Sequence, residues 1–124
     1  MTKILVIEDE ESVRENILEL LEVEGFNAIS AENGLIGLAK AQQQHPDLIL
    51  CDIRMPELDG YGVLTALRAE PTTARIPFMF LTAKAAKSDL KRGIELGANA
   101  YITKPFALTE LLKAICLLLV PRGA

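Results

Sequence analysis

The stretch Leu48-Ile49-Leu50-Cys51-Asp52 decides the fold, because four apolar residues in a row end in a carboxylate. A strand with one solvated face alternates apolar and polar residues, whereas a strand covered on both faces is apolar throughout. Continuous apolar runs are therefore typical of a parallel sheet with helices on both sides. Four further runs share this character, and they are residues 4–7, 26–31, 78–81 and 100–102.

The segments between these runs have helical periodicity. In the first, Val13, Ile17 and Leu21 recur every four residues, and Gly25 follows as a C-terminal cap. Four further stripes follow in order, carried by Leu35, Leu38 and Ala39, by Val63, Ala66 and Leu67, by Leu90 and Ile94, and by Leu108, Leu111, Leu112, Ile115 and Leu119. Strand and helix repeated five times predict an α/β fold with an open parallel sheet.

Length and composition exclude several classes of protein. A chain of 124 residues fits one domain, since domains run to about 100–200 residues. A net charge of −4 argues against direct nucleic-acid binding, which needs a basic stripe. The longest apolar run, 114–120, is shorter than a membrane span, so we expect no membrane insertion. We interpret Cys51 and Cys116 as reduced core residues of a cytoplasmic protein.

The C-terminal residues have two interpretations. We expect the domain to cover residues 1–120, followed by a tail at 121–124. The segment 119–123, Leu-Val-Pro-Arg-Gly, matches a thrombin cleavage site of the kind placed before purification tags. A natural helix end stopped by Pro121 is the alternative.

Polar side chains follow four of the runs at one edge of the expected sheet. Glu8 and Asp9 follow the first run, and Asp52 follows the third. Thr82 follows the fourth run and Lys104 the fifth. Ligands of such sheets bind beyond the carboxyl ends of the strands. If the first strand neighbours the third, three carboxylates come together there.

Clustered carboxylates need compensation, since two charges about 4 Å apart cost about 4 kcal/mol at an effective dielectric near 20. A raised pKa, a positive side chain or a bound cation can supply it. An oxygen-only set of few carboxylates suits Mg²⁺ better than Ca²⁺. Lys104 can neutralise charge and hold an anionic oxygen. With Asp52 as nucleophile, these groups are the components of phosphoryl transfer to a carboxylate.

Four segments, taken together, resemble the receiver domain of two-component response regulators, and in particular its chemotaxis-regulator-like members. They are Lys3-Ile4-Leu5-Val6-Ile7-Glu8-Asp9-Glu10, Pro46-Asp47-Leu48-Ile49-Leu50-Cys51-Asp52-Ile53-Arg54-Met55-Pro56 with Asp59-Gly60, Leu81-Thr82-Ala83, and Tyr101-Ile102-Thr103-Lys104-Pro105-Phe106. The resemblance covers nearly the whole chain. It implies a single-domain (βα)5 flavodoxin-like fold whose five-stranded parallel sheet has the order 2-1-3-4-5.

The resemblance also implies a phosphorylation site. Asp52 would accept a phosphoryl group from a sensor histidine kinase or a phosphotransfer protein. Mg²⁺ would be held by Asp9, Asp52 and the backbone carbonyl of Arg54, with Glu8 acting through a water molecule. Such a domain is a signalling module and not an enzyme, because it catalyses only its own phosphorylation and dephosphorylation.

A switch goes with this site in the resemblance. Thr82, the backbone of Ala83 and Lys104 would bind phosphoryl oxygens, and the Lys104–Pro105 bond would be cis. Tyr101 would turn inward as Thr82 moves toward the phosphoryl group. The surface of the fourth helix, fifth strand and fifth helix would then signal to a downstream output domain or protein.

The chain departs from the common pattern in three places. Glu8 stands where the family often has aspartate, and its extra methylene favours ligation through water. Residues 97–100, Gly-Ala-Asn-Ala, lack the acidic pair of many DNA-binding members, which puts their dimer mode in doubt. Arg54 and Lys84 are basic residues two positions beyond Asp52 and Thr82, and both would flank the phosphoryl group.

Other functions stay open from the residues alone. Glu8 and Asp9 would also suit the start of a helix, where acids favour the helix dipole, and Thr82 would suit a helix cap. A receiver-like docking module that is never phosphorylated is the main alternative. A flavodoxin lacks support, because acidic residues 8–11 repel phosphate. The nucleophile of haloacid-dehalogenase-like phosphatases follows the first strand in a D-x-D pattern that is absent here.

Overall fold

The computed structural model describes residues 2–83 and 87–119. Strands and helices alternate along these residues. The strands are β1 (Lys3–Ile7), β2 (Asn27–Ala31), β3 (Leu48–Asp52), β4 (Phe78–Ala83) and β5 (Ala100–Lys104). The helices are α1 (Glu11–Val23), α2 (Gly34–Gln44), α3 (Gly60–Ala69), α4 (Lys87–Glu95) and α5 (Leu108–Leu119). The predicted (βα)5 succession is confirmed, whereas Lys84 and the tail at 121–124 lie outside the described residues.

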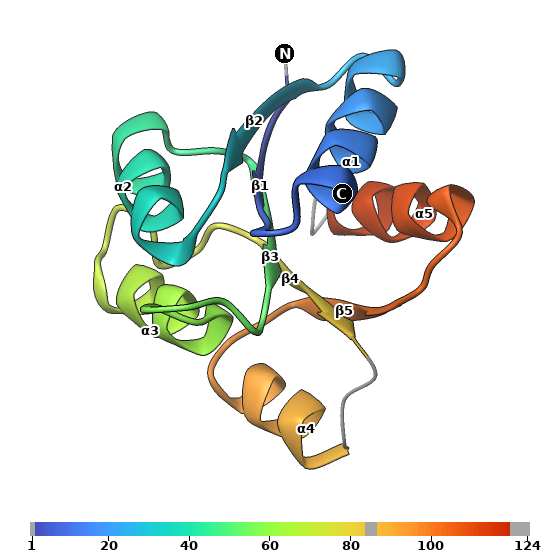
Figure 1. Ribbon diagram of the computed structural model, residues 1–124. Coiled ribbons are helices and arrows are strands. Elements are labelled where there is room, and N and C mark those ends of the chain that lie inside the picture. Colours follow the sequence, from blue (N-terminus) through green and yellow to red (C-terminus); the bar gives the residue numbers. More distant parts are fainter. Residues whose placement is uncertain (1, 84–86, 120–124) are drawn as a thin grey trace.

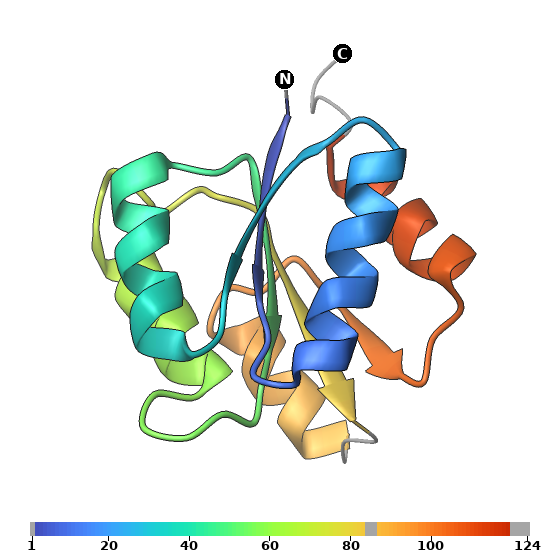
Figure 2. The ribbon, with the colours of Figure 1, turned by 45° about the horizontal axis from the view of Figure 1, so that its top comes forward.

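The five strands form one parallel sheet in the order β2-β1-β3-β4-β5. This is the flavodoxin-like order that the resemblance implies. Helices α1 and α5 cover one face of the sheet, and α2 and α3 cover the other (Figure 1). The second view shows the same three layers, with the sheet between the two groups of helices (Figure 2).

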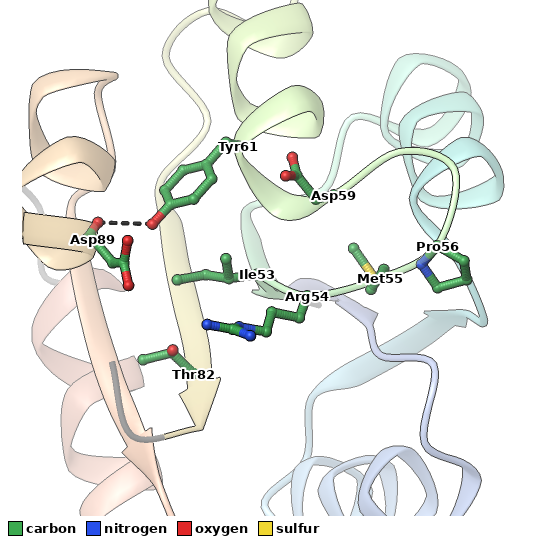
Figure 3. Close-up of a pocket in the computed structure, with 8 residues that line it drawn as sticks. All are labelled: Ile53, Arg54, Met55, Pro56, Asp59, Tyr61, Thr82 and Asp89. Atoms are coloured by element: carbon green, nitrogen blue, oxygen red, sulfur yellow. Dashed lines mark hydrogen bonds between the residues drawn. The ribbon is translucent and has the colours of Figure 1, made fainter. Parts of the chain in front are cut away.

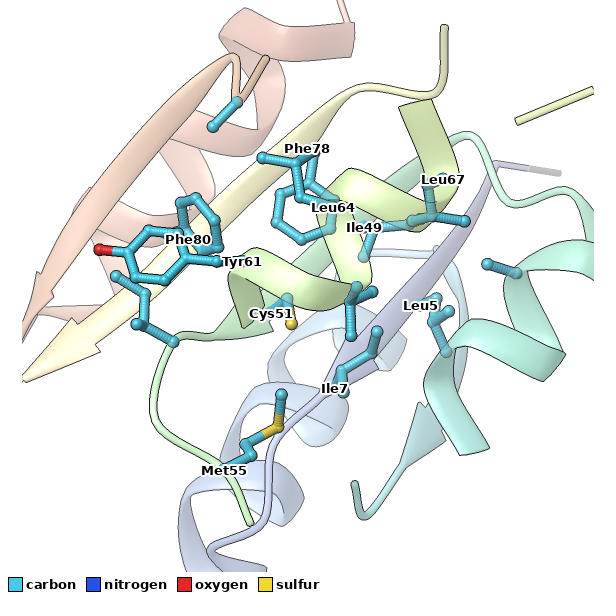
Figure 4. Packing of buried hydrophobic residues seen from close by; sticks show 14 of the residues in the cluster. Leu5, Ile7, Ile49, Cys51, Met55, Tyr61, Leu64, Leu67, Phe78 and Phe80 are labelled. Atoms are coloured by element: carbon cyan, nitrogen blue, oxygen red, sulfur yellow. The ribbon is translucent and has the colours of Figure 1, made fainter. Parts of the chain in front are cut away.

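The three central strands β1, β3 and β4 contribute alternate side chains to two apolar clusters, because successive residues of a strand point to opposite faces. On the α2–α3 face, the strand residues are Leu5, Ile7, Ile49, Cys51, Phe78 and Phe80 (Figure 4). On the α1–α5 face, they are Ile4, Val6, Leu48, Leu50, Met79 and Leu81. Burial on both faces explains why these strands are apolar throughout.

Helix α2 buries a different face from the one expected. Leu35 and Ala39 are exposed, while Gly34, Gly37 and Ala41 are buried. A Cβ at Gly37 would overlap the side chain of Ile7 in β1. The small residues therefore let α2 lie close against the sheet. The expected stripe was wrong for Leu35 and Ala39, whereas Leu38 is half-buried and packs against the core.

Two cysteines and one glycine test further details of the sequence analysis. Cys51 is buried as expected, but Cys116 is exposed on α5, so its assignment to the core was wrong. Gly25 follows α1 with a φ of 87°, a left-handed conformation that glycine adopts without strain.

Among the described residues, no helix has both the length and the apolar character needed to cross a membrane.

Candidate functional site

The carboxyl ends of four strands bring the expected site residues to one edge of the sheet. Glu8 directly follows β1, and Asp52 is the last residue of the neighbouring strand β3. Asp52 lies opposite Leu81 in β4, so Thr82 comes next along that edge. Ala83, in turn, lies opposite Lys104, the last residue of β5. The parallel register therefore unites residues that are up to 96 positions apart in sequence.

Glu8, Asp9 and Asp52 form a cluster of acids at this edge. One carboxylate oxygen from each lies within 4.8 Å of the others. Glu8 is fully buried, Asp52 is 8% exposed, and Asp9 is exposed to solvent. A small set of oxygen donors with an open side fits Mg²⁺, which keeps several of its waters when it binds a protein. The donor set thus fits the cation that the resemblance implies.

Lys104 bridges two of these acids. Its Nζ donates to Oε1 of Glu8 at 2.5 Å and to Oδ2 of Asp52 at 3.2 Å. The second oxygen of Glu8 accepts from the backbone N–H of Glu10 at 3.2 Å. The buried carboxylate of Glu8 is therefore satisfied at both oxygens by the protein itself.

The charges in the cluster shift the pKa values of its members. Burial raises the pKa of Glu8 to about 7, the hydrogen bond from Lys104 opposes this rise, and Asp52 adds to it. Burial alone would lower the pKa of Lys104, but its bonds to Glu8 and Asp52 raise it above the ordinary value. Lys104 is therefore charged at neutral pH, and its ammonium contacts two of the three acids, Glu8 and Asp52. The remaining negative charge favours binding of a divalent cation.

A close approach of α3 holds the loop after Asp52 in place. Asp59 caps α3 by accepting from the N–H of Gly62, and the N–H of Gly60 donates to the carbonyl of Ile53. A Cβ at Gly60 would overlap the carbonyl oxygen of Asp52. No residue larger than glycine therefore fits at position 60 without movement of the chain.

A cavity of about 520 Å³ opens beside this edge. The lining side chains come from the loop after β3, from α3, from Thr82 and from α4 (Figure 3); they are Ile53, Arg54, Met55, Pro56, Asp59, Tyr61, Thr82 and Asp89. The guanidinium of Arg54 extends into the cavity toward Thr82 (Figure 3). Tyr61 and Asp89 were not singled out from the sequence, because no motif marks them.

The expected switch residues lie in contrasting environments. Thr82 is 4% exposed, and its hydroxyl donates to the carbonyl of Ala83 at 2.8 Å. Tyr101 lies on β5 and is 45% exposed. The bond between Lys104 and Pro105 is cis, as the resemblance implies.

The fold and the acidic edge together define a flavodoxin-like α/β protein with an oxygen-donor site at the carboxyl ends of its strands. Comparison with known families narrows this class, since the model of the response regulator receiver domain matches residues 4–116. The chain belongs to the family of response regulator receiver domains of two-component systems.

Curated relatives and solved structures agree with this assignment. A probable transcriptional regulator, ycf27, of Porphyridium aerugineum is 45% identical over 88% of this chain and 44% of its own length. The DNA-binding dual master transcriptional regulator RpaA of Synechocystis is 38% identical over 96% of this chain and 49% of its own length. The chain thus spans about half the length of the curated relatives it matches.

Among solved structures, the chemotaxis protein CheY4 of Vibrio cholerae superposes with a TM-score of 0.91 at 30% identity, over 95% of this chain and 98% of that one. The receiver domain of a signal transduction histidine kinase from Syntrophus aciditrophicus superposes with a TM-score of 0.89 at 32% identity. That match covers 100% of this chain and 96% of the other.

Proposed function

We propose that this domain accepts a phosphoryl group on Asp52 from the phosphohistidine of a sensor histidine kinase or phosphotransfer protein. The observation that carries the proposal is the cluster of Asp52, Glu8 and Asp9 at the carboxyl edge of the sheet. Lys104 bridges Glu8 and Asp52 within this cluster. Such a concentration of charge is costly for the fold unless a cation and an anionic group use it.

In the proposed transfer, a carboxylate oxygen of Asp52 attacks phosphorus. The new O–P bond forms as the P–N bond to the donor imidazole breaks, and the bond electrons stay on nitrogen, which takes up a proton. Asp9, Asp52 and the carbonyl of Arg54 would hold Mg²⁺, with Glu8 acting through a water molecule. When bound, Mg²⁺ supplies positive charge next to the phosphoryl oxygens.

The other residues of the edge would hold the transferred group. Lys104 would exchange a carboxylate contact for a phosphoryl oxygen. The N–H of Ala83 and the hydroxyl of Thr82 would donate to further oxygens, which requires Thr82 to release the carbonyl of Ala83. Tyr101 would then turn inward.

The resulting change would reach the surface of α4, β5 and α5, and through it a downstream output domain or protein. Because the relatives of about twice this length are named as transcriptional regulators, we propose an output region beyond a domain that covers residues 1–120. The tail at 121–124 stays outside the domain in this proposal. The two free cysteines, Cys51 and Cys116, suit a reducing cytoplasm.

The test uses phosphoramidate and Mg²⁺ with the intact chain, and it detects the added phosphoryl group by mass spectrometry. Wild type should be labelled, and Asp52→Asn should not. Asp47→Asn is the matched control, because Asp47 lies just before the same strand and, among the hydrogen bonds described, its carboxylate accepts only from the N–H of Lys3. Labelling of Asp52→Asn would refute the proposal, and absence of labelling in wild type would favour the docking module.

A further inference from the structure

Helix α4 has little apolar anchorage to the rest of the domain. Among the side chains of α4 that the structure describes, those of Asp89 and Leu90 are half-buried and the larger ones that follow are exposed. Its buried residue in this region is Gly93, where a Cβ would meet the ring of Phe80. Since burial of an apolar face normally supplies most of the stability of a helix, polar contacts carry more weight for α4.

Tyr61 of α3 supplies such contacts. Its hydroxyl donates to the backbone carbonyl of Asp89 in the first turn of α4 at 2.8 Å. The guanidinium carbon of Arg92 lies 4.4 Å from the centre of the Tyr61 ring, a cation–π contact. The ring also packs edge-on against Phe80, with centroids 5.5 Å apart. We call the contacts of Tyr61 with Asp89 and Arg92 the α4 latch.

Packing in the core holds Tyr61, the α3 residue of the latch, in place. Tyr61 is only 6% exposed and belongs to the apolar cluster between the sheet and α3. Burial raises the pKa of Tyr61, and Asp89 raises it further, so the hydroxyl remains a donor at neutral pH. A movement of α4 therefore strains the latch, because Tyr61 cannot follow it without leaving its packing.

Thr82 and Asp89 line the same cavity, from the end of β4 and from the start of α4 (Figure 3). In the proposed function, Thr82 and Ala83 turn toward a phosphoryl group on Asp52. Ala83 and Asp89 are six positions apart in the sequence, and Thr82 and Asp89 line one cavity, so we expect this turn to displace the first turn of α4. A hydrogen bond of 2.8 Å tolerates little displacement before it is lost.

We propose that Tyr61 holds α4 in its unphosphorylated position, and that phosphoryl capture at Asp52 has to break the α4 latch. This inference rests on the proposed function of Asp52 and adds a residue that opposes the switch. By linkage, whatever weakens the latch should favour the phosphorylated state by the same factor.

Two variants weaken the latch without disturbing the core. Tyr61→Phe removes the hydroxyl and keeps the ring, and Arg92→Met removes the cation from an exposed position. Thr65→Ala is the matched control, because Thr65 is an exposed α3 residue. Among the described residues, its hydroxyl bonds only the carbonyl of Tyr61 within its own helix.

The first measurement is amide hydrogen exchange of the intact chain without phosphodonor. One lost hydrogen bond should speed exchange in α4 about two- to tenfold, with no change in β1 or β3. The second is the concentration of phosphoramidate that gives half-maximal phosphorylation in Mg²⁺, which should fall about two- to tenfold in both variants and stay at the wild-type value in Thr65→Ala.

The outcomes separate the two proposals. Unchanged exchange in α4 overturns the latch. Faster exchange with an unchanged phosphoramidate requirement overturns the coupling of the latch to phosphorylation. If wild type is not phosphorylated at all, the proposed function fails and the coupling fails with it, while the exchange measurement still decides whether Tyr61 holds α4.

Discussion

Replacing Glu8 with glutamine removes a buried negative charge and keeps the size of the side chain. In the wild type, burial raises the pKa of Glu8 from 4.5 to about 7. A shift of this size corresponds to roughly 3 kcal/mol against the ionised carboxylate, and it already includes the opposing hydrogen bond from Lys104. We expect Glu8→Gln to be more stable than wild type by about 1–3 kcal/mol near pH 8 without divalent cations.

The pH dependence of this stability difference follows from the direction in which the pKa of Glu8 is shifted. A carboxyl whose pKa is higher in the folded state binds its proton more tightly there, so its contribution to stability is complete below about 4.5 and is lost as the pH rises through about 7. The advantage of Glu8→Gln over wild type should therefore grow between about pH 5 and about pH 8.

Urea unfolding in EDTA at several pH values measures this difference. The control is Glu15→Gln, which removes an exposed carboxylate on α1 and should change the free energy of unfolding by less than about 0.5 kcal/mol. Added Mg²⁺ should stabilise wild type more than Glu8→Gln, because a ligand stabilises the state that binds it. If Glu8→Gln is less stable than wild type near pH 8, or if its gain in free energy of unfolding does not depend on pH, the ionised carboxylate of Glu8 does not destabilise the fold as argued.

Three further substitutions test the packing and hydrogen bonding of the domain. Gly60→Ala should lower the free energy of unfolding by about 1–3 kcal/mol, because the new methyl overlaps the carbonyl of Asp52; an unchanged midpoint in urea would contradict this. Thr73→Val should cost about 1–2 kcal/mol by thermal unfolding, since the buried hydroxyl donates to Leu67 at 2.7 Å. Asn33→Ala removes the cap of α2 and should cost about 1 kcal/mol, whereas Asn33→Asp, which keeps an acceptor, should restore most of the urea midpoint.

Much of the fold could be predicted from the sequence because its signals are local. Continuous apolar runs identify strands covered on both faces, and the runs at 48–51 and 78–81 lie within β3 and β4. Gly25 ends the first helix through its own backbone conformation. Such signals need only neighbouring residues, so they survive without knowledge of the tertiary structure.

The faces of the helices were less predictable. Apolar periodicity favoured Leu35 and Ala39 in α2, yet the glycines face the sheet. The reason is the short distance between α2 and the sheet. A helix that approaches a strand closely needs small residues on the face in contact, and the spacing of apolar residues in the sequence does not reveal how closely the helix approaches. Cys116 was misplaced for a related reason, because α5 is apolar over more of its circumference than it can bury.

The sequence by itself determined which residues stand at the carboxyl ends of the strands, because the alternation of strand and helix makes all strands parallel. It placed Asp9, Asp52 and Lys104 at one edge without any coordinates. Only the tertiary structure decided that the carboxylate of Glu8 is fully buried and bonded to Lys104, and that Tyr61 reaches the carbonyl of Asp89. These pairings depend on angles and distances between elements far apart in sequence, and residue types constrain those quantities only through the packing of the whole domain.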